Sequence, residues 1–169
     1  MRDARLTVGK AYLLQAEEDL QAAKTIGNNL LTAPSTFCML LQMVFEKLAK
    51  AEKYKAWEML PTHLGHELAS EYFAKFFSAN MRMAPRQRKY SRLIGLIQEL
   101  ERLQPSVARR ISENEPQLEY PWIDKNGGVR TPVLDLPLAN RLRVSLQARM
   151  TAYAALKFAQ EFVNERKVC

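Results

Sequence analysis

The fold is decided by the stretch Ala33-Pro-Ser-Thr-Phe-Cys-Met-Leu-Leu-Gln-Met-Val-Phe-Glu-Lys-Leu-Ala-Lys-Ala-Glu-Lys-Tyr54. Apolar residues recur in it at alternating steps of four and three, which is the spacing of one face of an α-helix: Phe37, Leu41, Val44, Leu48 and Ala51. Cys38, Leu40 and Phe45 widen this face beyond what a surface helix needs. The stretch therefore predicts a central helix that is contacted on several sides.

The two ends of this helix differ in character. Pro34 suits the first turn, and Thr32 is the expected N-cap. Towards the C-terminal end the outer face becomes charged, with Glu46 and Lys50 four residues apart and Lys47 between them. Two interpretations stand: the lysines contact the phosphates of a ligand, or Glu46 and Lys50 form an exposed ion pair that adds about 0.3 kcal/mol. We expect any ligand to bind at this end.

Length and composition are those of one ordinary domain. The chain has 169 residues, of which 47% are hydrophobic and 25% charged, and we take residues 1–169 as a single domain. No apolar run approaches the roughly 20 residues of a membrane span, and no apolar segment follows the charged N-terminus. Cys38 and Cys169 are too few for a disulfide framework or a zinc site. We therefore expect a cytoplasmic protein with no membrane association and no cofactor.

Further helices follow from the same periodicity. They cover residues 7–26, 66–78, 88–103 and 138–164, with a short helical turn at 105–111. Pro61 is expected to end or interrupt the central helix. In the last helix these side chains are expected to face inward: Leu142, Leu146, Met150 (or Arg149), Tyr153, Leu156 and Ala159.

Residues 112–137 break the helical pattern. They contain four prolines and the pair Gly127-Gly128, and their apolar residues favour an ordered loop over a flexible linker. No segment has the period of a strand that merits a prediction. The predicted fold is an all-α up-and-down bundle of four to five main helices, with this irregular Pro/Gly/aromatic loop before a long last helix.

The net charge of +7 is unevenly distributed. Residues 1–71 hold eight Lys or Arg and nine Asp or Glu, whereas residues 72–169 hold seventeen and nine. Two windows contain no acidic residue, and their basic residues are Lys75, Arg82, Arg86, Arg88, Lys89 and Arg92 in the first and Arg141, Arg143, Arg149 and Lys157 in the second. This pattern favours a nucleic acid, a nucleotide or an acidic protein as partner. A solvated basic surface without a partner is the alternative.

No enzyme signature is evident in the chain. His63 and His66 are three residues apart, but they straddle a predicted helix start, and no glutamate has a histidine three positions later, as di-iron bundles require. The six glycines are scattered and form no phosphate-binding loop. We expect no metal site, and a capping or packing role for the two histidines.

Four motifs in order resemble the HEPN superfamily of small helical domains. They are Ala16-Glu-Glu-Asp-Leu20 with Ala22-Ala23, Phe45-Glu-Lys-Leu-Ala-Lys-Ala51 after Gln42, His63-Leu64-Gly65-His66-Glu67-Leu68, and Glu119-Tyr120-Pro121. The resemblance covers residues 8–165. It implies a helical bundle that is commonly a homodimer and handles RNA or nucleotides, often beside a nucleotidyltransferase. Many members are metal-independent ribonucleases of toxin–antitoxin and phage-defence systems.

The chain departs from the nuclease members of that superfamily. They carry an arginine followed by a histidine four to six residues later near the end of the bundle, whereas no histidine follows Arg141, Arg143 or Arg149 here. Metal-free RNA cleavage needs an acid or base near neutral pH, which histidine usually supplies. We therefore expect a non-catalytic module that binds RNA, a nucleotide or a nucleotidyltransferase-type partner. The expected binding residues are Lys47, Lys50, Arg82, Arg86, Arg88, Lys89, Arg92, Arg141 and Arg143.

Two alternatives remain open. The first is a metal-independent endoribonuclease that uses His63 or His66. The second is a structural dimer whose interface consists of the aromatic residues of 72–77 and 120–122.

Overall fold

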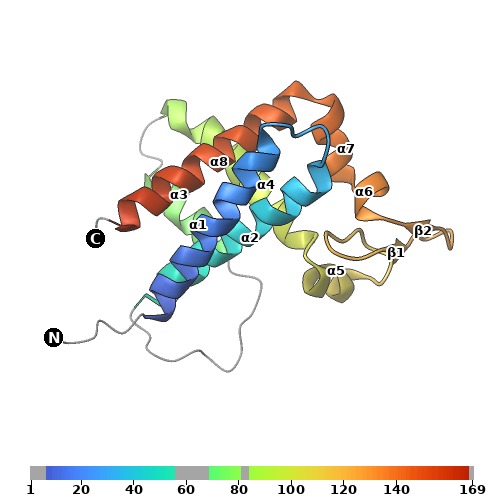
Figure 1. The fold of residues 1–169 in the computed structure, drawn as a ribbon, viewed down its shortest axis with the longest axis horizontal. Helices are drawn as coiled ribbons and strands as arrows, with labels where there is room; N and C mark the ends of the chain where they lie inside the picture. Colours follow the sequence, from blue (N-terminus) through green and yellow to red (C-terminus); the bar gives the residue numbers. More distant parts are fainter. Residues whose placement is uncertain (1–6, 56–68, 81–83, 168–169) are drawn as a thin grey trace.

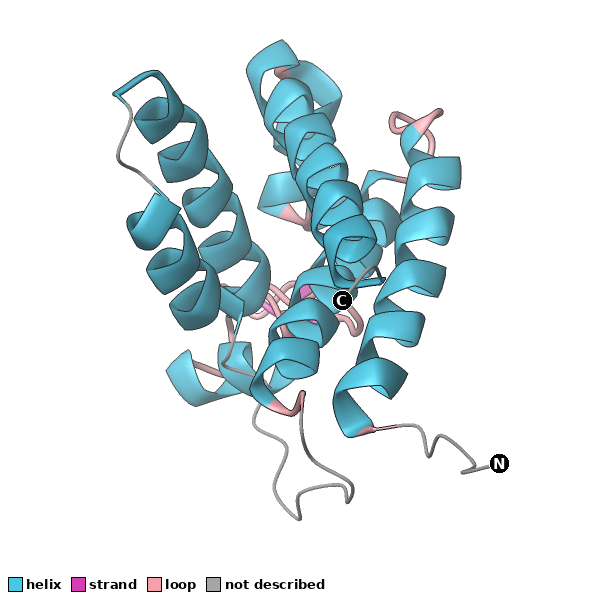
Figure 2. Ribbon diagram, turned by 90° about the vertical axis from the view of Figure 1, so that its left-hand side faces the viewer, coloured by secondary structure: helices cyan, strands magenta, loops and turns pink. Residues whose placement is uncertain are grey.

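The structure is a computed structural model that describes residues 7–55, 69–80 and 84–167. Helices dominate this part of the chain, and one two-stranded sheet lies at the end away from both termini (Figure 1). The helices are α1 (Val8–Gly27), α2 (Pro34–Lys53), α3 (Ala69–Asn80), α4 (Ala84–Arg102), α5 (Pro105–Ile111), α6 (Pro132–Asp135), α7 (Pro137–Val144) and α8 (Leu146–Lys167), and the strands are β1 (Trp122–Ile123) and β2 (Val129–Arg130). The long helices pack side by side (Figure 2), which confirms the all-α bundle. None of the described helices is long and apolar enough to cross a bilayer.

The helix predicted to be central is α2. It contacts α1, α3, α4, α6, α7 and α8. Its apolar face is fully enclosed, since Phe37, Leu41, Val44 and Leu48 are each at most 1% exposed. Burial of this face therefore contributes to the stability of the bundle, because hydrophobic stabilisation scales with the apolar area removed from water.

Both ends of α2 differ from the prediction. Thr32 is not the N-cap: Ala33 takes that position without a side-chain hydrogen bond, and the Thr32 hydroxyl donates to the Asn29 carbonyl instead (2.8 Å). The helix ends at Lys53, before Pro61. Tyr54 leaves the helical conformation there, and its carbonyl accepts a hydrogen bond from the Gly9 N–H of α1 (3.1 Å).

A glycine allows the close approach of α1 to the end of α2. A Cβ atom on Gly9 would lie 2.6 Å from the Lys55 Cα and 2.7 Å from the Ala51 carbonyl oxygen. Both neighbours are backbone atoms, which cannot move aside as a side chain can. Any larger residue at position 9 would therefore push the two helices apart.

The aromatic face of the third predicted helix points into the core. Phe73 and Phe77 of α3 are 0% exposed. The Phe73 ring meets Phe45 of α2 edge-on with centroids 5.3 Å apart and Phe162 of α8 at 5.5 Å, in the geometry that aromatic pairs favour. These rings thus join α2, α3 and α8.

The remaining boundaries show which signals were reliable. α1 and α5 begin and end within one residue of prediction, and the Thr7 side chain caps α1 by accepting from the Lys10 N–H (3.3 Å). α3 extends two residues beyond its predicted end, and its predicted start at 66–68 lies outside the described residues. α4 begins at Ala84, four residues early, because Pro85 fits the first turn of a helix rather than preceding it.

The predicted long last helix is two helices, α7 and α8, and this prediction was wrong. Ser145 adopts an extended conformation (φ −108°, ψ 113°) between them. The break changes which face of α8 is buried: Leu146, Met150 and Tyr153, expected inward, are 65%, 57% and 45% exposed. Leu142, Leu156 and Ala159 do face inward, as predicted. The inward face of α8 also contains Ala152, Ala155, Phe162 and Val163.

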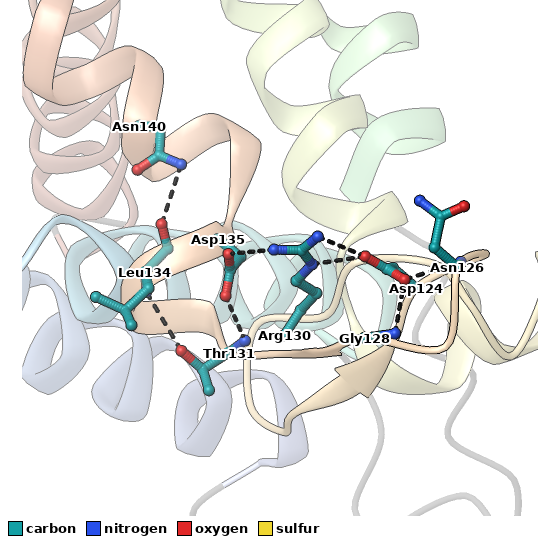
Figure 3. Close-up of polar contacts among 8 residues, drawn as sticks. All are labelled: Asp124, Asn126, Gly128, Arg130, Thr131, Leu134, Asp135 and Asn140. Atoms are coloured by element: carbon teal, nitrogen blue, oxygen red, sulfur yellow. Dashed lines mark hydrogen bonds and ion pairs between the residues drawn. The ribbon is translucent and has the colours of Figure 1, made fainter.

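The loop at 112–137 is ordered by polar contacts around Asp124 and Arg130 (Figure 3). One Asp124 carboxylate oxygen accepts from the N–H groups of Asn126 and Gly128 (both 2.9 Å), and the other pairs with Arg130 at 2.6 Å. Arg130 also pairs with Asp135 of α6 (3.5 Å). These bonds lower the pKa of Asp124, the Gly128 N–H and the Arg130 side chain contributing most. The antiparallel β1–β2 pair inside this loop was not predicted.

Candidate nucleic-acid interface

A groove of about 320 Å³ lies between α4 on one side and α7 with the start of α8 on the other. Its apolar lining comes from Leu96, Leu138 and Ala148. Its polar lining comes from Arg92, Glu99, Arg141, Ser145, Gln147 and Thr151. We call it the basic groove. Two of the predicted binding residues, Arg92 of α4 and Arg141 of α7, meet in it although they are 49 positions apart in the sequence.

The two arginines of the basic groove differ in their partners. Arg141 forms an ion pair with Glu99 across the groove, with about half of the Arg141 side chain exposed. Arg92 is exposed, and among the described residues it has no ion-pair partner. Lys89, one turn before Arg92 on α4, is also exposed. The groove therefore has a net positive charge and one guanidinium ready for an anion.

A buried thiol lies in the field of the Glu99–Arg141 pair. Cys38 of α2 is 1% exposed, and its burial raises the pKa of the thiol to about 12. The charge of Glu99 raises this pKa further, whereas the charge of Arg141 lowers it. Cys38 is thus a protonated core residue and offers no nucleophile to the groove.

Ser145 joins α7 to α8 at the edge of the basic groove. Its backbone N–H donates to the Arg141 carbonyl (2.8 Å), and its hydroxyl accepts from the Ala148 N–H (3.2 Å). Ser145 therefore ends α7 and caps the N-terminus of α8. Gln147 in the first turn of α8 and Thr151 in the second follow directly along the groove. The positive end of the α8 dipole adds to the attraction for an anion.

The lining of the groove suits binding better than catalysis. Of the described residues that line it, Glu99 is the single carboxylate, and none is a histidine, cysteine, lysine or tyrosine. No group there exchanges a proton near neutral pH, as acid–base catalysis requires. Guanidinium and amide N–H groups are, in contrast, good donors to phosphate oxygens.

Lys47 and Lys50 lie elsewhere, at the contact of α2 with α1. Lys47 pairs with Asp19 of α1 at 2.5 Å. Lys50 is only 4% exposed and pairs with Glu46 at 2.5 Å. The predicted Glu46–Lys50 pair thus exists, but it is buried rather than exposed.

Neighbouring groups complete this polar contact. The Gln42 amide donates to the second oxygen of Glu46 (2.8 Å), and the Lys50 ammonium lies 5.7 Å from the centre of the Tyr12 ring. Burial raises the pKa of Tyr12, and the Tyr54 and Glu46 charges raise it further. Both lysine charges are therefore matched by internal acids.

The other predicted site residues are dispersed. Arg143 of α7 donates to the Asn140 side-chain oxygen (2.5 Å) and to the Val133 carbonyl (2.8 Å), so it supports the α6–α7 connection. Arg86 and Arg88 belong to α4, but their side chains are not among those described. Arg82, His63 and His66 lie outside the described residues.

Sequence reasoning missed four polar residues of the basic groove: Glu99, Ser145, Gln147 and Thr151. Two signals were present. Glu99 is the first acid after the acid-free window of residues 72–98, and Ser145 has the side chain of a good N-cap. Gln147 and Thr151 had no such signal, because they line the groove only once the break at Ser145 has fixed the orientation of α8.

No cluster of three or more His, Cys, Asp or Glu residues is present among the described residues, so a metal centre has no candidate ligands there. Comparison of the chain with protein-family models, with curated proteins and with solved structures finds no match in any of the three. The likeness to HEPN domains thus rests on the four sequence motifs alone.

Proposed function

We propose that this protein is a non-catalytic, HEPN-like cytoplasmic module that binds RNA or a nucleotide through the basic groove. One observation carries the proposal: Arg92 and Arg141, which belong to separate acid-free windows of the sequence, line the same groove. The order of the four HEPN-like motifs supports the choice of RNA or nucleotide as the anion.

The dimensions and chemistry of the groove agree with this ligand class. A volume of about 320 Å³ is at the lower end of the range of small-molecule sites, roughly 300–1,000 Å³. Arg92 is available for a phosphate, and the Gln147 amide offers hydrogen bonds to a sugar or base. The Thr151 hydroxyl donates to the Gln147 carbonyl (3.0 Å) and can accept a further hydrogen bond. A longer RNA strand can continue past Lys89 towards the start of α4, where Arg88 and Arg86 come just before Lys89 in the sequence.

Fluorescence anisotropy with a labelled single-stranded RNA of 12 nucleotides tests the proposal. We expect affinity to fall steeply between 50 and 200 mM salt, because each neutralised phosphate releases a counterion on binding. Arg92→Gln should weaken binding about 5-fold to 10-fold and reduce the salt slope by roughly 0.7.

Lys10→Gln is the matched control for Arg92→Gln. It removes the same charge from an exposed residue at the far end of α1, about 25 Å along that helix from Gly27, which lies next to α8. We expect a change of less than 2-fold. Binding that ignores salt, or that weakens equally in both variants, would refute the basic groove as the site.

The integrity of the RNA separates this proposal from the ribonuclease alternative. After incubation with EDTA, the wild-type protein should leave the RNA intact. Cleavage that disappears in a His63→Ala/His66→Ala variant would replace the binding proposal with a metal-independent nuclease.

A further inference from the structure

Helix α8 is apolar on two faces, of which only one is covered. One face packs into the core through Ala152, Ala155, Leu156 and Ala159. On another face Leu146, Met150 and Tyr153 are 65%, 57% and 45% exposed at steps of four and three residues. We call these three residues the outer stripe.

The outer stripe differs from ordinary surface hydrophobics. Single exposed apolar residues are common and need no explanation, whereas a contiguous apolar patch marks a contact surface. Here the spacing is that of one helix face, and Val144 at the end of α7, 84% exposed, precedes the stripe at the corner between α7 and α8. This corner lies at the outer edge of the molecule (Figure 1).

The surroundings of the outer stripe are basic. Arg143, Arg149 and Lys157 lie beside it in the sequence, and no Asp or Glu occurs from Leu136 to Gln160. Lys157 continues the stripe by one further turn, with 75% of its side chain exposed, and its ammonium lies 4.0 Å from the Glu161 carboxylate. The patch therefore combines an apolar centre with a positive rim.

Two of the rim cations are held in place by hydrogen bonds to neighbouring oxygens. Arg149 donates from one terminal nitrogen to the carbonyls of Leu142 and Arg143 (both 3.0 Å), so its other nitrogens keep N–H groups. Arg143 is held by Asn140 and by the Val133 carbonyl. Guanidinium groups fixed in this way are preorganised for carboxylates, to which they can donate two parallel hydrogen bonds.

From these observations we infer that the outer stripe docks an acidic amphipathic helix of a partner protein. Apolar anchors of that helix, spaced three or four residues apart, pack on Leu146, Met150 and Tyr153. Its carboxylates meet Arg143, Arg149 and Lys157. This surface is separate from the basic groove, so the inference does not depend on RNA binding.

Two other occupants fit the observations less well. A second copy of this chain joined through the same face would place each basic rim against another, because a two-fold interface brings identical patches together. A membrane-surface helix typically carries Trp or Phe on its apolar face and many lysines. The outer stripe has neither Trp nor Phe, and the Tyr153 hydroxyl is already bonded to the Gly27 carbonyl (2.9 Å).

Selection from a display library of random 16-residue peptides tests the inference with the full chain as bait. The Leu146→Gln/Met150→Gln variant is used for counter-selection. We expect the enriched peptides to contain more Asp and Glu than Lys and Arg, with Leu, Ile, Phe or Met at helical spacing. The best peptide, synthesised and measured by calorimetry, should lose at least 10-fold in affinity for the double variant and about 3-fold for Lys157→Gln.

Leu14→Gln is the matched control, because Leu14 is a 51% exposed leucine on α1. This variant should bind the peptide as the wild type does. The double variant should keep its melting temperature and its affinity for RNA, which separates this test from that of the basic groove.

Three results would overturn the inference. The first is enrichment of peptides without an acidic excess, or of none that distinguishes the double variant. The second is wild-type binding to phosphatidylserine vesicles that the double variant loses. The third is a dimer in light scattering that the double variant converts to a monomer.

Discussion

The contact of α1 with α2 and the corner of α7 with α8 both contain cationic and apolar side chains, but they differ in how far these side chains are paired or covered. In the first, Lys47 and Lys50 are matched by Asp19 and Glu46 at 2.5 Å. In the second, cations line an open groove and apolar residues of α8 face solvent. In the first region both lysines have a carboxylate partner within the protein. In the second region, among the described residues, Arg92 has no ion-pair partner and the apolar side chains of the outer stripe are exposed. A binding partner is therefore expected at the second region.

The difference shows how far a cluster of lysines in a sequence can be trusted as a ligand site. Lys47 attracts attention near the charged end of α2, but its partner Asp19 lies 28 residues earlier on another helix. A cation paired with a carboxylate attracts a phosphate only after losing that carboxylate. Whether a lysine or arginine can bind an anionic ligand thus depends on which carboxylates the fold brings close to it.

The largest effect is expected from a substitution that breaks the buried Glu46–Lys50 pair. Glu46→Ala leaves the Lys50 ammonium buried without its carboxylate, which typically costs about 3–5 kcal/mol of the free energy of unfolding. Urea denaturation measures the loss. Glu71→Ala is the control, since Glu71 and Lys75 form the same i,i+4 pair at 2.6 Å with both side chains largely exposed. A much smaller loss is expected there, because solvent screens an exposed pair. Equal losses would contradict the burial of the first pair.

The two faces of α8 provide the next test. Leu156→Ala removes a side chain that is 7% exposed and should lower the free energy of unfolding by about 2–4 kcal/mol through the cavity it leaves. Met150→Ala, on the outer stripe, should change it by less than about 0.5 kcal/mol. Thermal and urea denaturation of both variants check this prediction. A large loss for Met150→Ala would mean that the outer stripe is covered in solution.

The stability of the protein at alkaline pH tests the burial of Cys38. The folded state raises the pKa of Cys38 to about 12 from an ordinary value near 9, so the unfolded chain loses this proton first. Stability is therefore complete below about pH 9 and decreases as pH rises towards 12, by about 2 kcal/mol at pH 10.5.

Urea denaturation from pH 8 to pH 10.5 measures this decrease. Cys38→Ala should show a shallower decrease than the wild type, because the titrating thiol is gone. Folded protein should also react slowly with thiol reagents at pH 8. A fast reaction without urea would show that Cys38 is accessible.

The smallest expected effect concerns the internal acid of the basic groove. Glu99→Gln removes the carboxylate that holds Arg141, and this should raise the affinity for the 12-nucleotide RNA about 3-fold, roughly 0.7 kcal/mol. Glu113→Gln, the same change at an exposed residue that does not line the groove, should leave affinity within 1.5-fold. Anisotropy at 100 mM salt compares them. A weaker complex for Glu99→Gln would assign Glu99 to positioning Arg141 rather than to competing for it.

Most helices of the fold could be predicted from local sequence signals. The stripe from Phe37 to Leu48 identified the central helix, and Thr7 and Pro105 marked the starts of α1 and α5 because capping and the fixed φ of proline act within one turn. The break at Ser145 was missed since Leu142, Leu146 and Met150 keep helical spacing across it. Periodicity reports the pattern of a helix but not whether the helix is continuous.

The candidate site was predictable only in part. The acid-free windows pointed to Arg92 and Arg141, yet their meeting depends on how α4 packs against α7 and α8. The assignment of Glu99 to Arg141 likewise spans 42 residues, and no local rule predicts such a pairing. Contacts between distant segments are decided by packing of the whole chain, which a single sequence does not specify by inspection.

The backbone conformation of Ser145 determines which side chains at the start of α8 are exposed. Were α7 to continue without interruption, the leucine of position 146 would follow that of position 142 into the interior. The extended backbone of Ser145 instead changes the direction of α8, so that Leu146, Met150 and Tyr153 face solvent while Leu156 and Ala159 stay buried. Insertion or deletion of a residue in this connection would therefore turn these apolar side chains towards or away from solvent while the sequence of the helix itself is kept.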